Sequence, residues 1–193
     1  DEENVRNNKL TRVVNVSAQK PRILYVEGEP RWEMKFIRRA LEEDTALRLV
    51  SILRTTENKI YRQGIDHPSE LEKGFPSKAE ELFAFHGLIF GSVDANYFTP
   101  GQQELIRDFV DRRGGGVLFL GGRAALAEGG YSRPPFSDLL PVTLPDRKGT
   151  FHRDPAVLEM TPMGRESVIL RLVENPEANV ERWKKMPPLA DYQ

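Results

Sequence analysis

The stretch that decides the fold runs from Arg22 to Pro30 and reads Arg-Ile-Leu-Tyr-Val-Glu-Gly-Glu-Pro. Its short, continuous apolar run is typical of a strand that is buried on both faces of a parallel sheet. In residues 31–42, apolar residues recur at spacings of three and four, which predicts an amphipathic helix opened by Pro30. Trp32 and Phe36 belong to this apolar pattern, so we expect both side chains to pack in the core.

Further strands and helices alternate along the chain. Apolar or β-branched runs predict strands at residues 47–53, 87–93 and 117–120. A helix that begins at Thr99-Pro100 precedes the last of these strands. Such alternation predicts an α/β fold with a mainly parallel sheet, right-handed crossovers and helices on both faces.

The remaining segments are less regular. Residues 54–85 contain glycines, prolines and few periodic apolar positions, which favours a long loop with one short helix near residues 78–83. A short helix is expected at residues 123–128, after a pair of glycines. In the last third of the chain, strands are expected at residues 157–160 and 168–172. The closing segment from Trp183 to Leu189 resembles a docking tail.

The first twenty residues differ from the rest of the chain. Residues 10–17 are rich in β-branched residues and predict one strand, which Lys20-Pro21 interrupts. We interpret residues 1–20 as a linker or as the last strand of a preceding β-sandwich domain, and residues 21–193 as one α/β domain.

Composition excludes several classes of function. The chain has 28 basic and 29 acidic residues, so no excess charge favours nucleic acid or anionic lipid. Its apolar runs are far shorter than the roughly 20 residues of a membrane span, so this segment should not insert into a bilayer. The absence of cysteine excludes disulfides and thiolate chemistry, and three widely spaced histidines make a metal site improbable. We expect no cofactor.

In an open parallel sheet, ligands bind in the crevice beyond the carboxyl ends of the strands. The candidate crevice residues that follow the predicted strands are Glu27, Gly28, Ser92, Asp94, Gly121, Gly122 and Arg123. The paired glycines could open a helix that holds an anion, but a simple tight turn is favoured because a glycine pair is a weak signal. The carboxylates could form an acid–base pair, but a position at the wet rim or in a helix cap is the favoured interpretation.

Several separate blocks of sequence resemble one known family. These blocks are Ile23–Glu33, Phe109–Gly122, Phe136–Val142 and Trp183–Leu189. Together they resemble the class I glutamine amidotransferase-like domain of large bacterial membrane-associated proteins that also carry von Willebrand factor A modules. The resemblance covers the chain from about residue 21 to its end, and it implies a flavodoxin-like sheet.

The resemblance also shows what this chain lacks. True amidotransferases use a cysteine on a sharp strand-to-helix elbow, with a downstream His and Glu, to attack the glutamine amide. Here the corresponding segment, residues 116–123, places Phe119 or a neighbour at the nucleophile position. His152 is followed by Arg153 and Asp154, and no His-x-Glu element occurs anywhere. The chain is therefore not expected to be an enzyme.

We expect a catalytically inactive module that binds a partner or an unknown small ligand through the crevice or the 54–85 loop. Its partners would be other domains or proteins of a membrane-associated assembly. The resemblance implies the soluble part of a membrane-anchored bacterial protein, on either side of the membrane. Two alternatives stay open: a hydrolase that uses Ser92 as nucleophile or Glu27 and Asp94 as acid and base, and a purely structural spacer.

Overall fold

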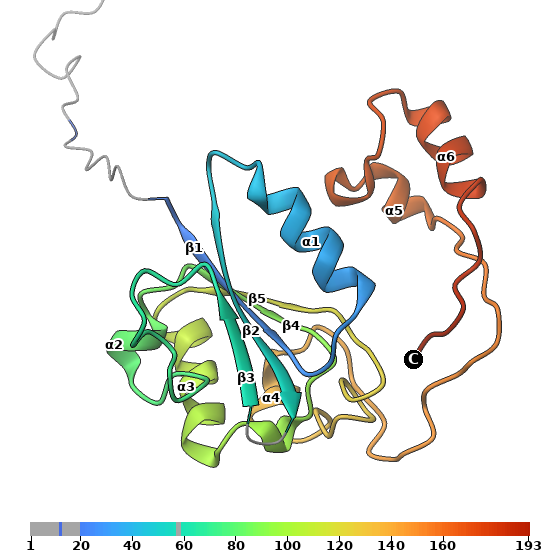
Figure 1. The fold of residues 1–193 in the computed structure, drawn as a ribbon. Helices are drawn as coiled ribbons and strands as arrows, with labels where there is room; N and C mark the ends of the chain where they lie inside the picture. Colours follow the sequence, from blue (N-terminus) through green and yellow to red (C-terminus); the bar gives the residue numbers. More distant parts are fainter. Residues whose placement is uncertain (1–11, 13–19, 57–58) are drawn as a thin grey trace, which may run out of the picture.

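The computed structural model describes residue 12, residues 20–56 and residues 59–193. The strand predicted at residues 10–17 and the interpretation of residues 1–20 therefore fall almost entirely outside the described residues. The described part contains one sheet, helices on both of its faces, and residues 151–193, which we call the C-terminal arm (Figure 1).

The sheet has five strands in the order β3-β2-β1-β4-β5. Their bounds are β1 (Arg22–Glu27), β2 (Arg48–Thr56), β3 (Lys59–Gln63), β4 (Gly87–Phe90) and β5 (Gly116–Phe119). β1 pairs in parallel with β2 and β4, and β4 pairs in parallel with β5. Only β3 is antiparallel, to β2. The predicted α/β fold with a mainly parallel sheet is confirmed.

β3 corrects the prediction of a long loop over residues 54–85. β2 extends to Thr56, which pairs with Lys59 of β3, and the register shifts between Arg54 and Thr56. β3 reads Lys-Ile-Tyr-Arg-Gln and lies at the edge of the sheet. A short edge strand with so many polar residues lacks the apolar run by which the other strands were recognised.

Helices cover both faces of the sheet. On one face lies α1 (Trp32–Glu42), and on the other lie α2 (Ala79–Leu82), α3 (Pro100–Asp111) and α4 (Phe136–Leu139). Thr99 caps α3 through a capping box, in which its hydroxyl accepts from the Gln102 backbone N–H and the Gln102 side chain accepts from the Thr99 backbone N–H. The predicted start of this helix and the predicted short helix near residues 78–83 are confirmed.

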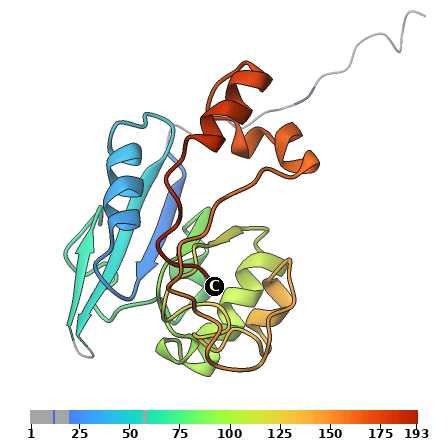
Figure 2. The same cartoon turned by 90° about the vertical axis from the view of Figure 1, so that its right-hand side faces the viewer.

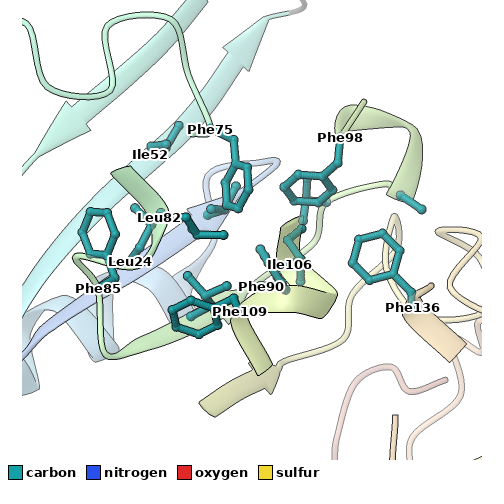
Figure 3. Close-up of a cluster of buried hydrophobic side chains, with 14 of the residues drawn as sticks. Leu24, Ile52, Phe75, Leu82, Phe85, Phe90, Phe98, Ile106, Phe109 and Phe136 are labelled. Atoms are coloured by element: carbon teal, nitrogen blue, oxygen red, sulfur yellow. The ribbon is translucent and has the colours of Figure 1, made fainter. Parts of the chain in front are cut away.

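The larger hydrophobic core lies between the sheet and α2, α3 and α4 (Figure 3). Aromatic rings contribute much of it: Phe75 and Phe90 meet Phe98 edge to face, with ring centroids 4.9 and 5.2 Å apart. Edge-to-face rings add about 0.5–1.5 kcal/mol per pair beyond their buried area. This core fixes the relative positions of β1 and β4, whose carboxyl ends build the candidate site.

The opposite face of the sheet carries a smaller cluster under α1. Met34 is buried against Tyr25 and Ile89. Trp32 and Phe36, in contrast, are 67% and 60% exposed, so the prediction that they pack in the core is wrong. α1 carries two apolar stripes, and a helix that lies on a single sheet can bury only one of them.

Three predicted elements after β5 are also corrected. Residues 123–128 form turns and no helix, since Leu126 adopts a left-handed conformation with φ 49°. Residues 157–160 are irregular, and the expected strand at 168–172 is replaced by the 3₁₀ helix η3 (Val168–Leu170). A strand-like composition does not produce a strand where no neighbouring strand is available to pair.

The C-terminal arm is built from two chain segments that run side by side. Isolated bridges join His152 to Tyr192 and Ala156 to Leu189. Beyond them lie α5 (Pro162–Glu166), η3 and α6 (Pro176–Lys184), which project away from the sheet in two perpendicular views (Figures 1 and 2). Within the described residues, the helices are too short or too polar to span a bilayer.

Candidate functional site

The carboxyl ends of β1, β4 and β5 meet at one edge of the sheet because the register aligns Val26 with Phe90 and Phe90 with Phe119. Each of these three strands is followed by a loop that contains candidate crevice residues. β1 ends at Glu27, and the loops after the three strands begin at Gly28, at Gly91 and at Leu120. The structure therefore brings together the segments that the sequence placed at the crevice.

Glu27 is the centre of this edge, and it is fully buried. Its Oε2 accepts hydrogen bonds from the Tyr25 hydroxyl at 2.8 Å and from Nε and Nη2 of Arg31 at 3.1 and 3.0 Å. Its Oε1 accepts from the backbone N–H groups of Gly28 at 3.0 Å and Ser92 at 2.8 Å. Placement of Glu27 at a wet rim is therefore wrong: the carboxylate is an internal hub whose two oxygens accept five hydrogen bonds.

The partners of Glu27 are held in fixed protonation states. Burial raises the pKa of Tyr25 well above its usual value, and the charge and hydrogen bond of Glu27 raise it further. Burial alone would lower the pKa of Arg31, but the hydrogen bond and charge of Glu27 raise it overall. Tyr25 thus stays a neutral donor and Arg31 a cation at neutral pH, so neither group is suited to proton transfer.

Ser92 connects the end of β4 to the turn after β5. It is 2% exposed, and its hydroxyl oxygen accepts a hydrogen bond from the Ala124 backbone N–H at 3.1 Å. None of the three histidines hydrogen-bonds to Ser92 in the described part of the chain, where His67 instead contacts Ser69. Ser92 is therefore enclosed, and no histidine of the described residues serves it as a general base.

Glycines allow the three loops to pack tightly together. A Cβ on Gly28 would lie 2.1 Å from the Ser92 carbonyl oxygen, and one on Gly122 would lie 2.7 Å from the Ser92 Cβ and 2.9 Å from Nη1 of Arg31. Gly121 and Gly122 adopt positive φ values of 69° and 136° and lead into turns, so no helix N-terminus is available there for an anion. The tight-turn interpretation of this glycine pair fits the observed geometry.

At the outer side of the site, Glu29 and Arg123 form an ion pair with 2.5 Å between Oε2 and Nη2. Burial raises the pKa of Glu29, but hydrogen bonds from Arg123 and Ser92 and the charges of Arg123 and Arg31 lower it overall. Asp94, in contrast, does not join Glu27: its side chain accepts from the Asn96 backbone N–H at 2.8 Å and caps the 3₁₀ helix η2 (Ala95–Tyr97). The acid–base pair of Glu27 and Asp94, which the sequence left open as an alternative, is not assembled, and Asp94 instead has the helix-capping role that was favoured for it.

The Glu29–Arg123 pair should make folding stability depend on pH. The pKa of Glu29 is lower in the folded state than in the unfolded state. The stability that the ion pair contributes is therefore complete at pH values above the unfolded-state pKa of about 4.3, and it is lost as the pH falls through the folded-state pKa of Glu29. The effect should be small because Arg123 is largely exposed. Urea unfolding between about pH 6 and pH 3 should show the stability difference between wild type and Glu29→Gln shrinking as the pH falls. Arg123→Gln should reduce the same pH dependence, because only the Ser92 hydrogen bond and the Arg31 charge then lower the pKa of Glu29. A stability difference between wild type and Glu29→Gln that is constant with pH would contradict this role for Glu29.

A large cavity lies away from this site. Its volume is about 760 Å³, and it is lined mainly by residues 67–78 together with Arg22 and Phe85. In the described part of the chain, no group of three or more His, Asp or Glu side chains is placed to hold a metal ion. The 54–85 segment named from the sequence as a binding surface therefore does border a hollow.

Sequence reasoning found the loops of the site but missed three of its members: Tyr25, Arg31 and Ala124. A signal existed for two of them. Tyr25 and Glu27 are two residues apart on a strand and so point to the same face, and Arg31 follows Glu27 by four residues. No comparable signal pointed to Ala124, which contributes only a backbone N–H.

A mainly parallel α/β sheet and the absence of cysteine are established for this chain. Such a sheet is shared by many unrelated families, so it does not by itself identify one. The likeness to amidotransferase-like domains therefore remains a prediction from the quoted sequence blocks. We compared the chain with protein-family models, with curated proteins and with solved structures, and none of them matches it.

Proposed function

We propose that this chain is a non-catalytic interaction module: a flavodoxin-like domain of the class I glutamine amidotransferase-like type that has lost the residues for amide hydrolysis. One observation carries the proposal. The strand-end crevice, where such a fold would bind its substrate, is occupied by the domain's own Glu27, Arg31 and Ser92. Polar groups that already form internal hydrogen bonds are not available to bind a substrate.

The position of the expected nucleophile supports the same proposal. Phe119 ends β5, and its ring packs against Phe90 and Tyr131 with centroids 5.7 and 5.8 Å apart. This side chain builds the core and offers no nucleophilic atom. Glutamine hydrolysis by this class of mechanism needs a thiolate at that place, and the chain has no cysteine.

The geometry also weighs against the hydrolase alternative. A serine nucleophile needs a base within hydrogen-bond reach and an open path for its substrate. Ser92 is 2% exposed and is bonded to Ala124, and Glu27 is saturated by its five donors. Asp94 caps another element, so the three residues do not form a catalytic group.

Two exposed aromatic side chains on α1 favour a role in binding another protein. Trp32 and Phe36 stack on the outer side of α1 with centroids 6.1 Å apart, and both are more than half exposed. Aromatic residues are enriched in protein interfaces, and clustered exposed apolar side chains commonly mark binding sites.

In keeping with the resemblance, we infer that the partners belong to a bacterial membrane-associated assembly. A small ligand in the cavity beside residues 67–78 is the second candidate, because of that cavity's size.

The test is an activity and ligand screen of the 193-residue chain. Ammonia release from glutamine and hydrolysis of an activated ester should equal the rates of heat-denatured protein, and neither Ser92→Ala nor the exposed control Ser77→Ala should change them. About 10 mM glutamine should leave the melting temperature unchanged, because a ligand that binds only the folded state raises it. Turnover that disappears in Ser92→Ala alone would overturn the proposal.

A further inference from the structure

β5 forms one edge of the sheet, and β3 forms the other. β5 reads Gly-Val-Leu-Phe, with no charged residue, no proline and no register shift against β4. β3, in contrast, carries Lys59 and Arg62, and the register shifts beside it. Charged side chains and bulges are devices by which proteins keep a sheet edge from pairing with other chains. The β3 edge therefore has this protection, and the β5 edge does not.

Half of the backbone polar groups of β5 point away from β4. The Leu120 N–H donates to the Phe90 carbonyl at 2.9 Å. Successive residues of a strand direct their N–H and C=O groups to opposite sides, so Leu118 and Leu120 face β4, whereas Val117 and Phe119 face outward. Among the described residues, no hydrogen bond reaches the outward N–H and C=O groups of Val117 and Phe119. The edge thus presents two donors and two acceptors.

The β5 edge also has free space on the α1 side of the sheet. Val117 and Phe119 pack against the larger core, so Leu118, between them, points to the opposite face, where it is 51% exposed. Gly116 is exposed as well, and a Cβ added to it would meet no atom within 4 Å. Another chain therefore has room to lie along this end of β5.

We propose that the β5 edge is a docking site for an extended segment of a protein partner, which adds to the five strands of this sheet as one more strand. An extended backbone presents its own N–H and C=O groups at the strand repeat, so it matches the outward groups of Val117 and Phe119. A helix uses its backbone groups internally and does not offer them.

The exposed side chain of Leu118 adds a preference to this recognition. A residue of the added strand that lies beside Leu118 on the same face would contact it, and cross-strand apolar pairs stabilise a sheet. We therefore expect the partner segment to carry an apolar or β-branched side chain at that position. This inference rests on the proposed interaction function and specifies the kind of segment that the partner supplies.

Amide hydrogen exchange of the isotopically labelled 193-residue chain, followed by NMR, first tests the edge itself. The N–H groups of Leu118 and Leu120 bond to β4 and should exchange slowly. The N–H groups of Val117 and Phe119 should exchange at least about tenfold faster, because nothing in the described chain protects them. Equal protection of all four groups in the isolated chain would show that the edge is already covered, and it would overturn the proposal.

The second measurement adds a defined strand-forming peptide, acetyl-Thr-Val-Thr-Val-Thr-Val-amide. Because the backbone carries the recognition, a peptide chosen for its β-propensity alone should bind. At about 5 mM it should slow exchange at Val117 and Phe119 at least about threefold, which corresponds to about two thirds of the chains being bound. The amide signals of β3 should not change. The same peptide with every backbone nitrogen methylated keeps the side chains, has no N–H donors and should have no effect.

Leu118→Lys is the matched test within the chain, since a lysine on an edge strand opposes pairing. It should weaken peptide binding at least about threefold. Val142→Lys, at a 58% exposed valine outside β5, is the control and should bind like wild type. Both replaced side chains are more than half exposed, so urea midpoints should show that both variants fold.

Three results would each overturn the proposal: no response of Val117 and Phe119 to the peptide, an equal response to the methylated peptide, or undiminished binding by Leu118→Lys. Protection that rises with the concentration of the chain alone would show that copies of the chain pair at this edge, and it would overturn the assignment of a different protein. Enzymatic turnover would refute the proposed function and leave these measurements unaffected, whereas an inactive chain that does not respond to the peptide would refute only this docking site.

Discussion

Replacing Glu27 with Ala should lower the free energy of unfolding by about 3–5 kcal/mol, which is the usual cost of removing one partner from a buried ion pair. The change leaves Arg31, whose side chain is only 14% exposed, without its carboxylate, and it also removes the acceptor for the Tyr25 hydroxyl and the Ser92 N–H. Urea unfolding followed by far-UV circular dichroism measures the loss.

Glu42→Ala is the matched control, since Glu42 also forms an ion pair with an arginine of α1, Arg38, but its own side chain is 61% exposed. Exposed pairs contribute about 0–1 kcal/mol, so this variant should differ little from wild type. Glu27→Ala combined with Arg31→Ala should be less destabilised than the sum of the single changes, because the double variant leaves no unpaired charge. A loss of less than about 1 kcal/mol for Glu27→Ala would mean that the hub does not hold the loops together.

Replacing Gly28 with Ala should cost about 3 kcal/mol, at the upper end of the usual range for overpacking. The added methyl group would lie 2.1 Å from the Ser92 carbonyl oxygen and 3.1 Å from the Val93 Cα, and both contacts are backbone atoms that cannot move aside cheaply. The loops after β1 and β4 would have to separate, which also weakens the Ser92 N–H bond to Glu27. Urea unfolding measures the cost, from the midpoint of the transition and the slope of the unfolding free energy against urea concentration.

Gly101→Ala provides the opposite case. Gly101 lies in the first turn of α3, and a methyl group added there would meet no atom within 4 Å, so Ala should be neutral or should stabilise the domain by up to about 1 kcal/mol. The two changes are chemically identical, and only the surroundings differ. Equal effects of Gly28→Ala and Gly101→Ala would show that the loops at the strand ends are not packed as tightly as the structure has them.

Local sequence patterns were sufficient where one element could be recognised from its own residues. The run Ile23–Val26 predicted a buried strand, and Thr99-Pro100 predicted the start of α3, because burial on both faces and a capping box each leave a local signature. The same approach missed β3, since an edge strand exposes much of its surface and needs no apolar run. It also predicted strands at residues 157–160 and 168–172, where the described part of the chain forms no strand ladder.

The sequence by itself determined the α/β class, the absence of cysteine chemistry and the loops that meet at the strand ends. Only the tertiary structure decided which stripe of α1 is buried, because Trp32-Phe36 and Met34-Ile37 both have helical spacing and the choice depends on where the sheet lies. Only the tertiary structure, likewise, placed the Ser92 N–H against Glu27, 65 residues away in the chain. Periodicity reports which residues share a face of one element, whereas the burial of a carboxylate depends on donors that distant elements bring to it.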